Sequence, residues 1–456
     1  MNKSMITSSA LGLIFFITVG CSQHLTNGTS PQLTRDDAYL YAKKGHEHKV
    51  SFQGLYRSEY SQLSELENRN LTQEILHMTP FLFGPLTYRS IGGVQKGERV
   101  QPLIESAYIE AGRVVVPFNY KGTWLIQRDN LENLQLPFPY SLTDIEQSDW
   151  KTCTETDSAD HSTWSFLWYF WDPTRAGCTN KLGQEYQIID IAIKEETVQT
   201  TNTYPEYQNM IHLVNGIPTF EMTFAFGYVD DSNASNPFKD SDYGVQQFQS
   251  FYRQLKTQLL PLGFKETPLL QSDYTVGNKK IGSLFSGTKN GTVVKISVVA
   301  AAGVDQMDLF ATSYAQKHQG FFGWFGHSRV GAGFDAQMMR NKLRFHPDRY
   351  SIVSDYQLIY WAGCNSYSYY TLPFFEMKSE LDPQKDPAGT KHLDIISNTL
   401  PSLFAFNAPN ANIVFQALFN WEQPSSYQKI VDALESFASG WNTDVMVNVL
   451  GDEDNN

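Results

Sequence analysis

Two patterns of apolar and polar residues divide this chain of 456 residues. From about residue 50 to 205, short stretches alternate with a period of two, which predicts β-strands with one buried face. The stretch RVVVPFNYKGTWLIQ, residues 113–127, predicts two strands joined by a turn at Lys121 and Gly122. The stretch HSTWSFLWYFWDP, residues 161–173, is apolar on both faces from Phe166 onward and predicts a strand buried between layers.

Beyond about residue 216, continuous apolar runs are interleaved with segments of helical period. The helical segments include YGVQQFQSFYRQLKTQLLPLGF, DQMDLFATSYAQKH and DAQMMRNKL. The apolar runs predict buried strands, and they are NGIPTFEMTFAFGYVDD, GTVVKISVVAAAG, FFGWFGH, YQLIYWAGC and LDIISNTLPSLF. Strands alternating with helices favour an α/β fold, an open and mainly parallel sheet with helices on both faces, preceded by a β-rich N-terminal domain.

The first residues, MNKSMITSSALGLIFFITVGCSQ, have the pattern of an export signal. Their apolar block is too short for a membrane span, which needs about 20 residues. The ending TVGC resembles the lipobox of bacterial lipoproteins, which implies a lipid on Cys21. Ser22 in the next position implies the outer membrane. Acyl chains on Cys21 would hold the protein to a membrane without a spanning helix; the alternative is an ordinary cleaved signal peptide.

Four regions follow from these patterns. They are a signal peptide at 1–20, a tether at 21–48, a β-rich domain at 49–210 and an α/β domain at 211–450. The net charge is −13 and no run of Lys or Arg forms a patch, which makes nucleic acid a poor partner. His46 and His48 in the tether are too few to form a metal site, and no cofactor is predicted.

Cysteine usage singles out one thiol. With Cys21 lipidated, an oxidising envelope compartment would pair two of the remaining three cysteines. Cys153 and Cys178 are 25 residues apart in one polar and aromatic region, so they are the expected disulfide. Cys364 is then the odd cysteine, which is buried and inert, joined to another molecule, or reactive.

His327 and Cys364 each end an apolar run and precede a small, polar loop. In an open parallel sheet, ligands bind outside the carboxyl ends of the strands. If the two strands are neighbours, both side chains project into one cleft, where His is the usual base for a thiol nucleophile. Backbone N–H groups of the loop near Gly326 could bind an oxyanion, so the predicted chemistry is acyl transfer.

The motifs FGHS and WAGCNS, in this order on successive strands, resemble the caspase, legumain, gingipain and clostripain group of cysteine peptidases. The resemblance covers roughly residues 216–420 and implies a caspase-like α/β fold that acts on polypeptides. By position, His327 matches the catalytic histidine and Cys364 the nucleophile. Ser328 stands where the family has an oxyanion-binding Gly, and its backbone N–H is the candidate donor. Asp230 and Asp231 are either specificity residues or loop acids.

Two other functions compete with a peptidase. A degenerate caspase-like domain would serve binding or assembly at the envelope and would keep Cys364 without catalysis. The stretch GHSRVG instead resembles the nucleophile elbow of serine hydrolases, with Ser328 as nucleophile. That elbow needs Gly where this chain has Val330. Residues 230–242 are rich in oxygen ligands but lack the spacing of a calcium loop, which favours a solvated loop.

Overall fold

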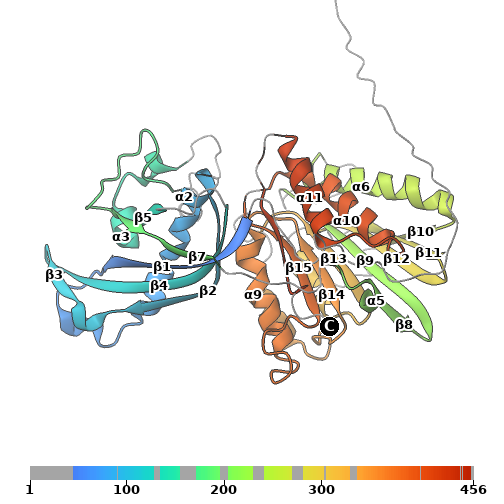
Figure 1. Ribbon diagram of the computed structural model, residues 1–456, viewed down its shortest axis with the longest axis horizontal. Coiled ribbons are helices and arrows are strands. Elements are labelled where there is room, and N and C mark those ends of the chain that lie inside the picture. Colours follow the sequence, from blue (N-terminus) through green and yellow to red (C-terminus); the bar gives the residue numbers. More distant parts are fainter. Residues whose placement is uncertain are drawn as a thin grey trace, which may run out of the picture.

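The computed structural model describes twelve stretches of the chain. They are residues 45–89, 91–127, 134–154, 171–195, 204–229, 241–269, 281–301, 304–328, 336–400, 402–441, 443 and 445–452. Figure 1 shows a smaller sheet formed by the N-terminal strands and a larger sheet formed by the C-terminal half, with helix α9 beside the junction.

The smaller sheet is antiparallel, with the strand order β2-β4-β1-β7 and β3 paired to β4. Its strands are β1 (Gly45–Arg57), β2 (Gly92–Pro102), β3 (Tyr108–Glu110), β4 (Arg113–Gln127) and β7 (Ala192–Glu195). A two-stranded sheet of β5 (Gln135–Pro139) and β6 (Tyr186–Asp190) lies nearby, with helices α1 (Leu71–Leu76), α2 (Phe83–Tyr88) and α3 (Leu142–Glu146).

The predicted turn at Lys121 and Gly122 is wrong. Strand β4 continues through both residues. All 13 residues of β1 pair with it, with Ser51 opposite Lys121 and Val50 opposite Gly122. The period of two persists on both sides of the Lys-Gly pair, and the 13-residue partner strand extends the same ladder. A lone glycine inside a strand pattern therefore marked no turn here.

The predicted tether also extends too far. Strand β1 begins at Gly45, so His46 and His48 belong to the sheet and not to a linker. His48 is fully buried and lies opposite Trp124 of β4. The predicted strand within 161–173 lies mostly outside the described residues.

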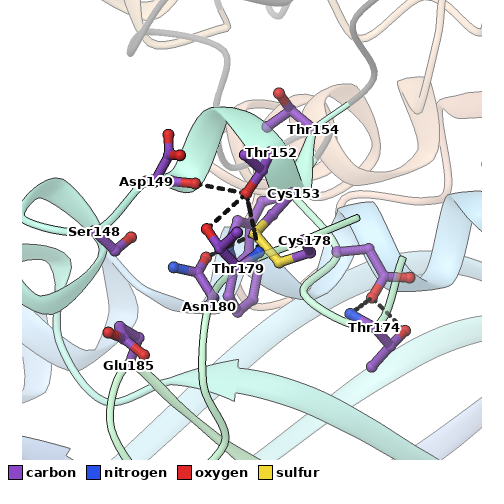
Figure 2. Close-up of a disulfide and its surroundings, with 12 residues drawn as sticks. Ser148, Asp149, Thr152, Cys153, Thr154, Thr174, Cys178, Thr179, Asn180 and Glu185 are labelled. Carbon is purple, nitrogen blue, oxygen red and sulfur yellow. Dashed lines mark hydrogen bonds between the residues drawn. A yellow bond between two sulfur atoms is a disulfide. The ribbon is translucent and has the colours of Figure 1, made fainter. Parts of the chain in front are cut away.

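The predicted disulfide is confirmed. Cys153 and Cys178 are bonded, with their Cα atoms 4.4 Å apart (Figure 2). The bond closes a 25-residue segment, and Cys153 is packed with Phe81 and Trp171 in a small core. It therefore holds two polar loops beside the small two-stranded sheet.

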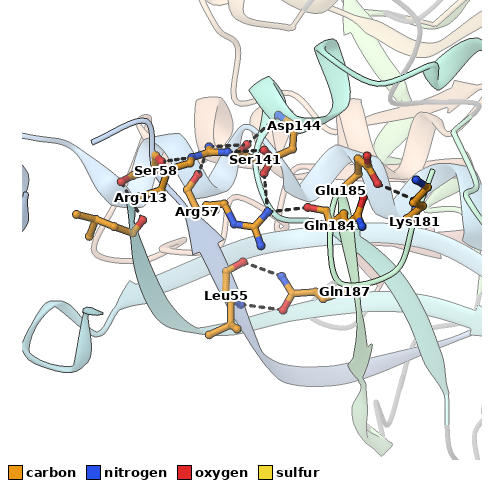
Figure 3. A network of polar contacts seen from close by, with 11 residues as sticks. Leu55, Arg57, Ser58, Arg113, Ser141, Asp144, Lys181, Gln184, Glu185 and Gln187 are labelled. Carbon is orange, nitrogen blue, oxygen red and sulfur yellow. Dashed lines mark hydrogen bonds and ion pairs between the residues drawn. The ribbon is translucent and has the colours of Figure 1, made fainter. Parts of the chain in front are cut away.

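A polar network joins α3 and the segment before β6 to the smaller sheet (Figure 3). Asp144 at the start of α3 forms ion pairs with Arg113 of β4 and with Arg57 of β1, the latter at 3.4 Å. Arg113 also donates to the Ser58 carbonyl at 2.8 Å, and Arg57 to the Gln184 carbonyl at 2.6 Å. Three segments distant in sequence are thereby joined through one carboxylate.

The larger sheet has the strand order β10-β11-β12-β9-β13-β14-β15-β16, with β8 also paired to β9. Strands β12, β9, β13, β14 and β15 are mutually parallel, and the strands toward both edges are antiparallel. The strands are β8 (Ile211–Val214), β9 (Ile217–Gly227), β10 (Lys265–Leu269), β11 (Ile281–Lys289), β12 (Thr292–Ala301), β13 (Gln319–Phe325), β14 (Gln357–Trp361), β15 (Leu393–Asn398) and β16 (Val447–Leu450).

Helices cover both faces of this sheet. Alternate side chains of the parallel strands therefore pack into two hydrophobic cores, one on each face. Phe224 of β9 packs with α6, α10 and α11, whereas Trp324 of β13 and Trp361 of β14 pack with α7, α8 and α9. The helices are α5 (Tyr207–Met210), α6 (Tyr243–Leu259), α7 (Val304–Ala315), α8 (Ala336–Phe345), α9 (Ser366–Ser379), α10 (Asn407–Phe419) and α11 (Tyr427–Ser439). The prediction of an α/β fold with a large, mainly parallel sheet is confirmed.

The strand order reverses at β9. The chain first moves from β9 to β12 on one side and then crosses to β13, β14 and β15 on the other. In open α/β sheets, the carboxyl ends of the strands at such a reversal form the usual ligand crevice. The residues after β9 and β13 lie at this point.

Candidate functional site

The two predicted site residues follow neighbouring strands. Strands β13 and β14 are adjacent and parallel, with Trp324 opposite Trp361, which meets the condition that the sequence argument set for a common cleft. Beyond the strands the chains stay close: a Cβ on Gly363 would lie 3.0 Å from the Gly326 oxygen and 3.2 Å from the Ser328 nitrogen. Glycine at this position therefore allows the backbone after β13 to approach the backbone after β14.

His327 is oriented by a backbone carbonyl from the next strand. Its Nε2 atom lies 3.3 Å from the oxygen of Val229, two residues after β9, and its ring packs edge-on against Phe404. Because a carbonyl oxygen only accepts, this hydrogen bond places the proton of a neutral ring on Nε2. Nδ1 is then the nitrogen that can accept a proton.

The residue that supplies this carbonyl, Val229, is itself held through its N–H by a buried carboxylate. Asp242 accepts the Val229 N–H, at 3.0 Å and 3.1 Å to its two oxygens, and also caps α6 by accepting the N–H groups of Gly244 and Val245. Only 6% of Asp242 is exposed. A chain of contacts thus runs from the start of α6 through Val229 to the imidazole.

Cys364 is a free thiol whose hydrogen bonds go to Ser402 and not to His327. The Ser402 N–H donates to the sulfur at 3.3 Å, and the thiol lies 3.6 Å from the Ser402 carbonyl oxygen. Burial raises the pKa of Cys364, and the backbone N–H of Ser402 offsets part of this effect. The raised pKa favours the neutral thiol at pH 7.

Alkylation of Cys364 is expected to follow this raised pKa. The rate with iodoacetamide should stay low at about pH 6 and rise with pH, with a midpoint above the usual thiol value of about 8.5. Peptide mapping by mass spectrometry at several pH values would measure it. Rapid labelling at pH 6 would show instead that the thiol is ionised.

Two buried polar groups flank the pair in sequence. The Ser328 hydroxyl and the side-chain amide of Asn365 are buried and have no hydrogen-bond partner among the described residues. Since no base contacts the Ser328 hydroxyl, the geometry does not favour Ser328 as a nucleophile. Asn365 has a positive φ of 46°, which Asn tolerates better than most residues, and it begins α9 directly after Cys364.

Sequence reasoning missed the groups that support the pair. The Val229 carbonyl and the Ser402 backbone carry no side-chain signal, so no motif could identify them. Asp242 did leave a signal, because an Asp immediately before a helical period is a typical N-cap. Asp230, Asp231, Val330 and Cys21 lie outside the described residues.

Comparison with known proteins gives no assignment. No protein family matches the chain, and no curated protein is significantly similar to it in sequence. Among the described residues, no helix has both the length and the apolar character needed to cross a bilayer.

Proposed function

We propose that this protein is a cysteine peptidase of the caspase-like type, with Cys364 as nucleophile and His327 as general base. The observation that carries the proposal is the oriented imidazole of His327, one strand away from the free thiol of Cys364 at the carboxyl edge of a parallel sheet. The sheet order, with the central strand reversal and an antiparallel β16 after β15, is consistent with a caspase-like fold.

The chemistry begins from a neutral thiol. The Cys364 sulfur attacks the peptide carbonyl carbon and forms a C–S bond, while the thiol proton passes to Nδ1 of His327. His327 then gives this proton to the leaving amine as the C–N bond breaks. Water hydrolyses the thioester and restores the thiol. The Ser328 N–H is the candidate donor to the oxyanion.

The attachment to the membrane is part of the proposal. A lipid on Cys21 would anchor the chain to the cell envelope, with the outer membrane favoured by Ser22. The folded part would then act on polypeptides that reach this membrane surface.

A second function is supported by one specific observation. The hydrogen bonds between Cys364 and Ser402, together with the raised pKa of the thiol, are what a structural cysteine in a non-catalytic binding or assembly domain would show. In that case the caspase-like domain is degenerate. The two functions differ in whether any peptide bond is broken.

Digestion of a peptide library distinguishes the peptidase from the non-catalytic binding domain. The purified protein is incubated with peptides from a whole-proteome digest, and new termini are identified by mass spectrometry. We expect cleavages that disappear in a Cys364→Ala variant prepared in the same way. Cleavages that persist in the variant, or a complete absence of wild-type cleavage, would support the binding domain instead.

A further inference from the structure

A group of metal-ligating side chains lies at the amino-terminal edge of the larger sheet, at the opposite end of β13 and β14 from His327 and Cys364. His212, His318 and Asp355 each bring one ligand atom within 4.8 Å of the other two. Among the described residues, this is the group of His, Cys, Asp and Glu side chains with such geometry. No local pattern of residues indicates this group, because its three members are spread over more than 140 positions.

The strand pairing explains how the two histidines meet. Strand β8 pairs with β9 up to Phe220, and β13 begins to pair with the same edge of β9 at Glu221. The start of β8 and the start of β13 therefore abut end to end. Gly320 confirms the close approach, because a Cβ there would lie 2.6 Å from the Met210 oxygen.

Asp355 comes from the loop that precedes β14, which is the neighbour of β13. Its Oδ2 atom accepts the His318 backbone N–H at 2.8 Å and lies 3.4 Å from His318 Nδ1. Lys378 of α9 holds this loop by donating to the carbonyls of Val353 and Asp355, at 2.7 Å and 3.3 Å. The hydrogen bond from the His318 N–H holds the Asp355 carboxylate beside the histidine, and the buried Lys378 holds the loop that carries it.

Both imidazoles have ring nitrogens available for a ligand. His212 Nε2 and His318 Nδ1 are buried atoms that make no hydrogen bond within the described residues. The two rings are 5.5 Å apart between centroids. His318 has a positive φ of 71°, a conformation that costs free energy in a non-glycine residue.

We infer that His212, His318 and Asp355 bind a divalent transition-metal ion of the zinc type. Two imidazoles and one carboxylate are ligands that Zn²⁺ accepts, and bonds of about 2.0–2.1 Å at tetrahedral angles place ligand atoms about 3.3 Å apart. The 3.4 Å between His318 Nδ1 and Asp355 Oδ2 already fits this value. The three ligand atoms lie within 4.8 Å of one another, so His212 needs to move inward to complete the site. The side chains of His318 and Asp355 are about one-third exposed, so water can supply the fourth ligand.

The metal would join three segments that the chain connects only distantly. They are the β8–β9 hairpin, the turn before β13 and the loop before β14. The site is separate from the proposed peptidase pair, and either assignment can fail without the other. Binding of the metal is expected to stabilise the folded protein, because an ion that binds only the folded chain shifts the folding equilibrium toward it.

Zinc titration of the chelator-treated protein tests the inference. Isothermal titration with ZnCl₂ alone is expected to give one ion per chain, and His212→Gln, His318→Asn and Asp355→Asn should each weaken binding by more than about 100-fold. Asn is chosen at position 318 because it tolerates a positive φ. His346→Gln, an exposed histidine after α8, is the matched control and should bind like the wild type.

A thermal melt of the same proteins provides a second readout. Zinc at about 100 times its dissociation constant is expected to raise the midpoint of the wild type by about 3 °C and to leave the three variants unchanged. Equal midpoints of all proteins in chelator would show that the variants fold. Wild-type protein without zinc binding, or folded variants that bind zinc as tightly as the wild type, would overturn the inference.

Discussion

Cys364→Ser and His327→Gln are each expected to lower the rate of peptide cleavage by at least about 10³-fold, measured on a peptide taken from the library digest. Serine is a much weaker nucleophile than cysteine beside the same base, and glutamine cannot accept the thiol proton. Because the two residues act in one step, the double variant should be no slower than the slower single variant.

Ser328→Ala is the matched control for these variants. It removes a hydroxyl that has no hydrogen-bond partner within the part of the chain that the structure describes, and it keeps the backbone N–H that is the candidate oxyanion donor. We expect its cleavage rate to stay within about 2-fold of the wild type. A loss of activity comparable to that of Cys364→Ser would favour the serine hydrolase that the GHSRVG motif suggested. Additive losses for Cys364→Ser and His327→Gln would mean that the two do not form one catalytic unit.

Asp242→Ala is expected to lower both stability and activity. The variant loses the N-cap of α6 and leaves the N–H groups of Val229, Gly244 and Val245 without their acceptor. The free energy of unfolding should fall by about 2–3 kcal/mol, measured by urea denaturation. Val229 would also lose the acceptor that holds its N–H, so its carbonyl would orient His327 less well and kcat should fall about 10-fold or more.

Asp242→Ser separates the two effects. A serine hydroxyl can cap the helix but is too short to hold the Val229 N–H as well. We expect this variant to recover most of the stability while kcat remains low and KM changes little. If kcat recovers together with stability, Asp242 acts only through the fold and does not position the histidine.

The parallel strands were predictable because both of their faces are buried. All seven residues of β13 and all five of β14 are buried, so each strand appears in the sequence as an unbroken apolar run. The runs place the ends of these strands to within three residues: β13 ends at Phe325 and β14 at Trp361, shortly before His327 and Cys364. The antiparallel strand β4 was harder, because its half-exposed face includes the Lys121-Gly122 pair that resembles a turn.

Long-range contacts account for what the sequence did not reveal. The Val229 carbonyl that orients His327 is a backbone group, and its position depends on how β9 and β13 pair. His212 and His318 meet only because two strands share one edge of β9. No local pattern encodes such an arrangement, since it depends on strand order and register.

Trapping an acyl intermediate would show whether Cys364 is the nucleophile. A peptide that the protein cleaves is mixed with a large excess of enzyme, the reaction is quenched in acid within milliseconds to seconds, and the protein is mapped by mass spectrometry. We expect an added mass equal to the acyl half of the peptide on Cys364, absent from Cys364→Ala and strongly reduced in His327→Gln. Cleavage of the peptide with the acyl group on another residue, or with no dependence on Cys364, would contradict it.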